Sequence, residues 1–266
     1  MKRILIILCL STITLVHSQS KQSLDTTADF KNSIGFEIGY NQAYLKDINF
    51  SPLNYTGGGI LYSLMYTHQI PEGIGIFNVD VDFSAGTIGT DANDFFDSSY
   101  TLVNAEISYL RKIYSIEDTW SFFLGGQYNT YAQEIDADEV EATSYLAAHG
   151  IGAKALATYR VNAKHRFNTS VVIPVVQILV RPPFNGENVS TQQKIDNGEF
   201  LNVLFSGDIA TFDAYFALDW KLNYQYELSS KVDLTATYLL RYQNVSGFNK
   251  LTQLHNQLSV VLLLKF

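Results

Sequence analysis

Residues 251–266, the last segment of the chain, alternate between apolar and polar side chains. A period of two places successive side chains on opposite faces of an extended strand. One face of this strand therefore meets apolar surroundings and the other does not. The even-numbered, apolar set includes Leu254, Leu258, Val260, Leu262, Leu264 and Phe266, and the odd-numbered, polar set includes Gln253, His255, Gln257, Ser259 and Lys265.

Nine further segments have the length of strands, and most repeat this alternation. In 212–228, Phe216 and Trp220 share one face while Asp219 and Lys221 share the other. A soluble antiparallel sheet also alternates, but it rarely keeps a bulky apolar face flanked by tyrosine on strand after strand. The ten predicted strands cover 34–45, 59–69, 74–86, 100–113, 120–131, 144–160, 166–180, 212–228, 231–243 and 251–266.

The connections between these segments alternate in length. A strict alternation of short and long connections predicts an even number of antiparallel strands, with both chain ends on the side of the short turns. Merging or splitting the weaker segments would give eight or twelve strands instead of ten. The short connections are 70–73, 115–119, 161–164 and 229–230, and the mostly longer ones are 46–56, 87–99, 134–143, 181–211 and 244–249.

Residues 1–18 have the features of a secretory signal peptide. Lys2 and Arg3 are followed by an apolar stretch over 4–16 that is too short to span a membrane, and small residues precede the predicted cleavage after Ser18. The only cysteine, Cys9, lies in this leader, so the mature chain is expected to have neither disulfides nor thiolate metal sites. Residues 19–33 are polar and aperiodic, which predicts a short periplasmic tail.

The composition of the chain limits the classes of partner that we expect it to bind. Loss of Lys2 and Arg3 with the leader changes the formal net charge from −8 to −10. An acidic chain without a basic tract is not expected to bind nucleic acid. No segment after the leader is apolar for the roughly 20 residues that a spanning helix needs, so any crossing of a membrane must use strands.

Together, the alternating segments, the leader and the terminal aromatic residue resemble a bacterial outer-membrane β-barrel. The resemblance implies an all-β fold, an antiparallel transmembrane β-barrel over 34–266, in a Gram-negative cell envelope with both termini periplasmic. It also implies that Phe266 is the signal read by the barrel assembly machinery, and that outer-membrane lipid and lipopolysaccharide are partners, with an envelope protein as a possible further partner. The Gln that closely follows the leader is similar to Bacteroidota leaders.

The inward faces of the predicted strands carry charged residues. Buried charges must be paired or hydrated, because burying an unpaired ion costs several kcal/mol. We therefore expect a lumen filled by a charge network, with an ion pair between Asp219 and Arg241. Alternatively, the small inward residues Gly125, Ala148, Gly150 and Gly152 would leave a thin polar pathway. The predicted network consists of Asp80, Asp82, Glu106, Lys154, Asp219, Lys221 and Arg241.

The segment 167–183 breaks the alternation. Its apolar residues occupy both faces, and Pro174 removes a ladder donor. Something apolar is then expected inside the outer end of this strand, and the connection 181–211, folded back over the mouth, is the candidate. The alternative is a binding site for a hydrophobic ligand at the outer mouth, formed by Val172, Val176, Ile178, Val180 and His255.

Catalysis is poorly supported by the sequence. His255 faces inward near Asp213 and could act as an oriented base, but a single inward histidine among polar residues is more often a hydrogen-bonded lumen residue. His68 and His149 fall on the lipid-facing phase. The motif of outer-membrane phospholipases is absent, and the paired acids of outer-membrane proteases cannot be placed. The acidic run 134–141 could hold calcium but lacks the glycine of an EF-hand. We predict no catalytic residues, no metal and no cofactor.

The sequence therefore predicts a non-enzymatic outer-membrane β-barrel that acts as a narrow, porin-like pore or as a structural or accessory component of an envelope assembly. Two alternatives remain open at this point. One is a carrier that moves a hydrophobic small molecule through the apolar outer mouth. The other is a surface hydrolase that uses His255 and Asp213.

Overall fold

The structure, a computed structural model, describes residues 31–117, 119–137, 142–181, 197, 200–247 and 250–266. The predicted signal peptide lies outside these residues, as does most of the predicted tail. The first described strand begins at Asn32.

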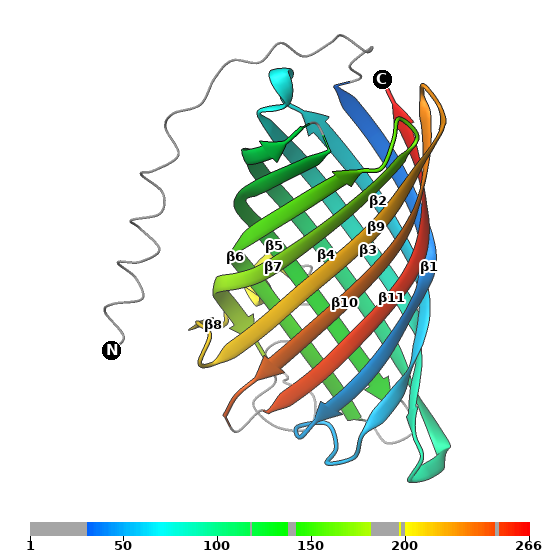
Figure 1. Ribbon diagram of the computed structural model, residues 1–266. Coiled ribbons are helices and arrows are strands. Elements are labelled where there is room, and N and C mark those ends of the chain that lie inside the picture. The colour runs from blue at the N-terminus through cyan, green and yellow to red at the C-terminus, as the bar shows by residue number, and fades with distance from the viewer. Residues whose placement is uncertain (1–30, 118, 138–141, 182–196, 198–199, 248–249) are drawn as a thin grey trace.

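Ten long strands form a closed antiparallel barrel, which confirms the predicted fold class and strand number (Figure 1). Neighbours in sequence pair around the ring, and β1 closes it against β11. The backbones of Asn32 and Phe266 exchange hydrogen bonds of 3.0 and 2.9 Å at this closure. The ring comprises β1 (Asn32–Asp47), β2 (Tyr55–Gln69), β3 (Gly75–Thr90), β4 (Asn93–Ile116), β5 (Trp120–Ala137), β6 (Ala142–Arg160), β7 (His165–Val180), β9 (Tyr215–Ser229), β10 (Val232–Val245) and β11 (Leu251–Lys265).

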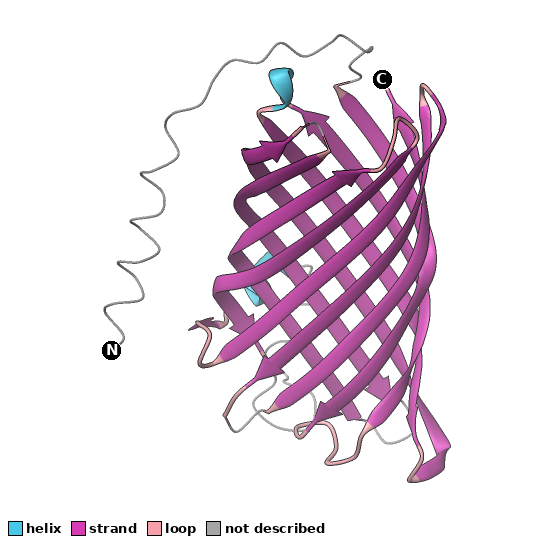
Figure 2. Cartoon of the chain, in the orientation of Figure 1, coloured by secondary structure: helices cyan, strands magenta, loops and turns pink. Residues whose placement is uncertain are grey.

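Three short elements complete the described structure. A 3-10 turn, η2 (Pro71–Gly73), connects β2 and β3. A short helix, α3 (Phe200–Leu204), and a short strand, β8 (Asp208–Ala210), lie in the connection between β7 and β9. Figure 2 shows how completely strands make up the wall.

The two ends of the barrel differ. At one end, the turn end, tight connections join the strands and the start of β1 lies beside the C-terminus (Figure 1). The other end, the loop end, holds the connection between β7 and β9. Strands run further here than predicted, and only Asp91 and Ala92 separate β3 from β4. The predicted long connection over 87–99 is therefore wrong, because the two strands continue to pair as a hairpin beyond the apolar part of the wall.

The alternation in sequence becomes an inside-out distribution of side chains. In β11, Leu258 points outward and is 67% exposed, whereas its neighbour Gln257 points into the lumen and is 4% exposed. The same holds for Leu64 and Ser63 in β2. An apolar outer surface around a polar interior is the arrangement that a bilayer requires of a barrel.

Candidate functional site: a charged cavity beneath an apolar plug

A cavity of about 40 Å³ lies inside the barrel wall. This volume holds about three waters, since a cavity needs roughly 10–15 Å³ of such space for one water. All seven residues of the predicted charge network border the cavity. Its lining residues are Asp80, Asp82, Asn104, Glu106, Lys154, Ser170, Val172, Asp219, Lys221, Leu239 and Arg241.

The charges are paired across strands. Arg241 on β10 faces Asp219 on β9. Its guanidinium donates hydrogen bonds to both carboxylate oxygens, from Nη2 to Oδ2 at 2.8 Å and from Nε to Oδ1 and Oδ2 at 3.0 Å. This is the pair that the sequence singles out. Lys154 on β6 reaches past β5 to pair with Glu106 on β4. These bonds link the strands through the lumen and offset part of the cost of burying the charges.

A layer of hydrogen bonds lies next to the charged residues. The two ring nitrogens of His255 are 3.3 Å from the hydroxyl of Tyr100 and 3.4 Å from that of Tyr131. Tyr100 also accepts a bond from Asn41, and Gln253 donates to Tyr131. The polar ends of the two tyrosines thus face the histidine, as buried phenols generally require.

The structure does not bring the two candidate catalytic residues together. Asp213 lies in the exposed turn before β9 and accepts a 2.5 Å hydrogen bond from Thr211, while His255 is buried in the lumen. A base must lie within hydrogen-bond reach of the group that orients it. Here tyrosine hydroxyls, rather than a carboxylate, contact both nitrogens of His255.

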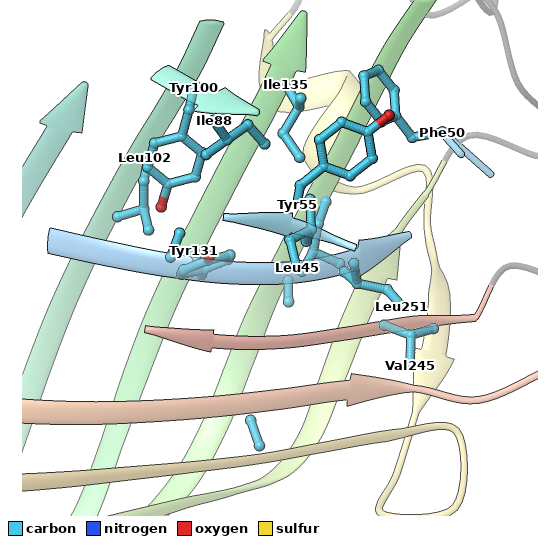
Figure 3. Close-up of a cluster of buried hydrophobic side chains, with 14 of the residues drawn as sticks. Leu45, Phe50, Tyr55, Ile88, Tyr100, Leu102, Tyr131, Ile135, Val245 and Leu251 are labelled. Atoms are coloured by element: carbon cyan, nitrogen blue, oxygen red, sulfur yellow. The ribbon is translucent and has the colours of Figure 1, made fainter. Parts of the chain in front are cut away.

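Towards the loop end, a buried apolar cluster, the plug, fills the lumen (Figure 3). Nine of the ten barrel strands contribute buried residues to it, and Leu179 of β7 packs against them. The ring of Phe50, from the connection after β1, packs edge-to-face against the ring of Tyr55, with 5.2 Å between the ring centroids. The plug comprises Ala43, Leu45, Phe50, Tyr55, Ile88, Tyr100, Leu102, Tyr131, Ile135, Ala137, Leu146, Ala148, Ala210, Tyr215, Ala217, Val245 and Leu251.

An ion pair spans the mouth beside the plug. The guanidinium of Arg181, which follows β7, binds both oxygens of Asp47 at the end of β1, at 2.7 and 3.1 Å. Ser144 of β6 also donates to this carboxylate, which is 1% exposed. We call these three residues the latch. Because β1 adjoins neither β6 nor β7, the latch ties non-neighbouring parts of the rim together.

Sequence reasoning missed both the plug and the latch. The signal was present at the inward positions nearest the loop end, where Leu45 and Leu251 replace the polar residues of the middle of their strands. The latch had no sequence signal of its own, since Asp47 and Arg181 are 134 residues apart.

The broken alternation in β7 has a different cause from the one predicted. Ile151 of β6 faces Val176 and the next residue, Gly152, faces Pro174, so Val175 forms a bulge. A bulge inserts one residue and shifts the facing of the strand by one position. Val172 points into the lumen before the bulge, whereas Val176, Ile178 and Val180 follow the outward phase after it. Together with the buried His255, these five residues therefore do not line one mouth.

The described part of the connection between β7 and β9 lies mainly on the outer wall. Val203 and Leu204 of α3 pack against Ala147 and Val180, which point outward. His149, on the predicted lipid-facing phase, is 3.0 Å from the carbonyl of Leu204. The predicted folding of this connection over the mouth is thus wrong for α3, and of its described residues only Ala210 joins the plug. Residues 182–196 lie outside the described part.

The small inward residues fit a closely approaching wall rather than an open pathway. A Cβ at Gly150 would lie 2.2 Å from the carbonyl oxygen of Val176 on β7, and one at Gly125 would lie 1.9 Å from that of Tyr109 on β4. Ala148 belongs to the plug. Bulky residues at Gly150 or Gly125 would therefore disturb strand pairing before they filled any channel.

Two further observations concern chemistry. Within the described ranges, no cluster of three or more histidine, cysteine, aspartate or glutamate residues is placed to hold a metal ion. Residues 138–141 of the acidic run lie outside those ranges. Also among the described residues, no helix is both long and apolar enough to cross a membrane.

Comparisons with solved structures identify the fold of this chain, whereas comparisons of its sequence find no relative. No family model matches the chain, and no curated protein matches its sequence. Among solved structures, the outer membrane protease OmpT of Escherichia coli matches with a TM-score of 0.56 at 7% identity, over 93% of this chain and all of OmpT. This chain has the fold of an outer-membrane β-barrel. At this identity, the likeness to OmpT concerns the fold alone.

Two other barrels align over most of both chains but less closely. The translocator domain of the autotransporter NalP from Neisseria meningitidis has a TM-score of 0.40 at 9% identity, over 100% of this chain and 95% of that one. Neisserial surface protein A has a TM-score of 0.37 at 12% identity, over 88% and 97%. The three proteins differ in their described roles.

Proposed function

We propose that the protein is a non-enzymatic barrel of the Gram-negative outer membrane, with its lumen closed at rest, and that it serves as a structural or accessory component of the envelope. The turn end, with both termini, faces the periplasm. The observation that carries the proposal is the plug, to which nine of the ten barrel strands contribute buried residues and against which Leu179 of the tenth packs. A pore that is open at rest would need a continuous wet path where these side chains lie.

Two features support closure beyond the plug. The latch holds the rim together through a buried, bidentate ion pair. Below the plug, the cavity has space for only about three waters. Ion pairs and apolar contacts thus fill the lumen at successive levels, as expected for a small barrel whose interior is only wide enough for side chains.

The hydrolase alternative has no geometric support, because His255 contacts Tyr100 and Tyr131 while Asp213 lies in an exposed turn. The carrier alternative cannot use the loop-end mouth without displacing the plug. A carrier would need another route, through the wall of the barrel.

Conductance of the purified protein in a planar bilayer tests the proposal. We expect an inserted but silent barrel, and we expect steady openings when the plug is cut back by the double variant Tyr100→Ala/Tyr131→Ala. The matched control is Tyr62→Ala/Tyr109→Ala, which removes two outward-facing tyrosines and leaves the lumen intact. Steady, discrete openings of the unaltered protein would overturn closure and would restore the narrow pore as the leading function.

A further inference from the structure

One seam in the barrel wall lacks strand pairing. β7 pairs with β9 from His165, opposite Tyr226, as far as Val172, opposite Asp219. Beyond this point β9 continues along β10 up to Tyr215, and β7 continues along β6 up to Val180. The residues 173–176 of β7 and 215–218 of β9, all of them described, therefore form no ladder with each other. We call this stretch the seam.

Local sequence features produce the seam. Pro174 has no N–H to donate, and the bulge at Val175 disturbs the strand at the same place. Further towards the loop end, β8 pairs with the edge of β7 that β9 has left, and Gln177 lies opposite Ala210. The unpaired stretch thus lies between the end of the β7–β9 ladder and the short β7–β8 ladder.

The outer side of the seam is apolar. Val175 and Val176 on β7 and Phe216 on β9 point to the exterior and are each more than a third exposed. Phe212 and Ile209 extend this surface towards the loop end. Membrane-facing residues are normally apolar. Here, however, they flank unpaired backbone, which hydrocarbon alone does not satisfy.

The inward residues of the seam itself, Pro174, Tyr215 and Ala217, are buried, and the last two belong to the plug. At the turn-end edge of the seam, however, the inner face of the wall is polar. Val172 and Asp219, the last pair of the β7–β9 ladder, both border the charged cavity. Arg241 also borders it and is 4% exposed, yet its Nη1 has no hydrogen-bond partner among the described residues, since Asp219 is bound through Nε and Nη2. A buried, unpaired donor costs free energy and favours an acceptor supplied by a ligand.

We propose that the seam is a lateral binding site for a single-chain amphiphile of the surrounding membrane, with its hydrocarbon chain against Val176 and Phe216 and an oxygen of its head directed to Arg241. The small volume of the cavity limits the head of the amphiphile to a small group. Four acids and three bases line it, so an uncharged hydroxyl or carbonyl head fits better than an anion. This site is independent of the closed lumen, because the ligand enters from the side.

The two tryptophans of the chain provide the test. Trp220 lies outward on β9, two residues from Leu218 at the edge of the seam, whereas Trp120 lies at the turn end against Tyr159. The variant Trp120→Phe leaves Trp220 as the only reporter, and Trp220→Phe leaves Trp120. Each protein is purified from membranes, reconstituted into phosphatidylcholine vesicles and titrated with a long-chain alcohol brominated along its chain, which quenches fluorescence on contact.

We expect the quenching of Trp220 to saturate at a mole fraction of the brominated alcohol roughly tenfold below the mole fraction needed to quench Trp120. A tenfold difference corresponds to a binding free energy about 1.4 kcal/mol more favourable at the seam than elsewhere in the bilayer. A brominated fatty acid, ionised at the pH of the titration, should bind more weakly at Trp220. If both reporters follow the same unsaturated partition curve, the proposal is overturned, and the seam is then better regarded as an edge for a partner strand.

Substitutions locate the site. Val176→Asp places a charge in the seam and should abolish the saturable quenching of Trp220, whereas Val103→Asp, on the continuously paired β4, should leave it in place. Because an added charge can prevent insertion, Phe216→Ala provides a second measurement and should raise the midpoint several-fold. Saturation that survives both seam substitutions would show that the amphiphile binds elsewhere. Bilayer conductance of the same samples reports separately on the closed lumen.

Discussion

The ion pair between Arg241 and Asp219 joins β10 to β9 inside the lumen. Removing one partner of a buried pair leaves an uncompensated charge, which typically costs about 3–5 kcal/mol. Asp219 is partly open to the cavity, with its side chain 20% exposed, so we expect Asp219→Asn to lower the free energy of unfolding by about 3 kcal/mol. Reversible urea unfolding in vesicles measures this change.

The matched control for this prediction lies at the turn end. Glu227 is 3.5 Å from Lys265 and its side chain is 41% exposed. An exposed ion pair contributes at most about 1 kcal/mol to the free energy of unfolding, because water screens the two charges. Glu227→Gln should therefore change the free energy of unfolding by less than a third as much as Asp219→Asn. Equal losses would show that the cavity is as well hydrated as the surface.

Residue-scale prediction from sequence worked where one strand pair decides the contact. Asp219 and Arg241 face each other because a tight turn fixes the register of β9 and β10, and register can be counted from a turn. The latch between Asp47 and Arg181 could not be counted in this way. It depends on how ten strands close into a ring, which no local pattern specifies.

At the scale of the element, β7 is the strand that the sequence describes least well. Period two identified the membrane-facing residues of β9, β10 and β11, because each keeps one phase along its lipid-facing length. In β7 the phase changes at Val175, and apolar residues on both sides of a bulge look like a strand buried on both faces. Periodicity cannot distinguish these two cases, so the sequence placed an apolar lid inside the barrel instead of α3 outside it.

The bulge makes a prediction about β7 itself. Val175 has no partner on β6, so deleting it should give a regular ladder while every other residue keeps its face. Deleting Val171, which pairs with both Ala155 and Trp220, should exchange the faces of one half of the strand and expose charge to lipid. Electrophoresis without heating, on which folded barrels migrate faster than unfolded chains, should show a folded protein only for the first deletion. A folded Val171 deletion would contradict this account of register.

At the scale of the whole molecule, the barrel is closed along its axis and least continuous at one place in its wall. The plug and the latch occupy the loop end, and the charged cavity lies beneath them. The seam adjoins the cavity at the pair of Val172 and Asp219. The seam is thus next to a charged part of the described lumen, and we expect a polar group to reach this part from the side. One bulge and one proline in β7 mark the place where the wall is interrupted.

The same layout predicts the selectivity of an opened barrel. Once the plug is cut back by Tyr100→Ala/Tyr131→Ala, ions must pass a cavity bordered by four acids and three bases. Its net negative charge should favour cations, because charges that line a narrow, low-dielectric passage concentrate counter-ions. The reversal potential under a salt gradient measures this preference. Adding Asp82→Asn should shift the reversal potential towards zero, since it removes one of the four negative charges, and Asp82 is hydrogen-bonded to the neutral amide of Asn104. An anion preference in the opened barrel would mean that the bases, rather than the acids, face the passage.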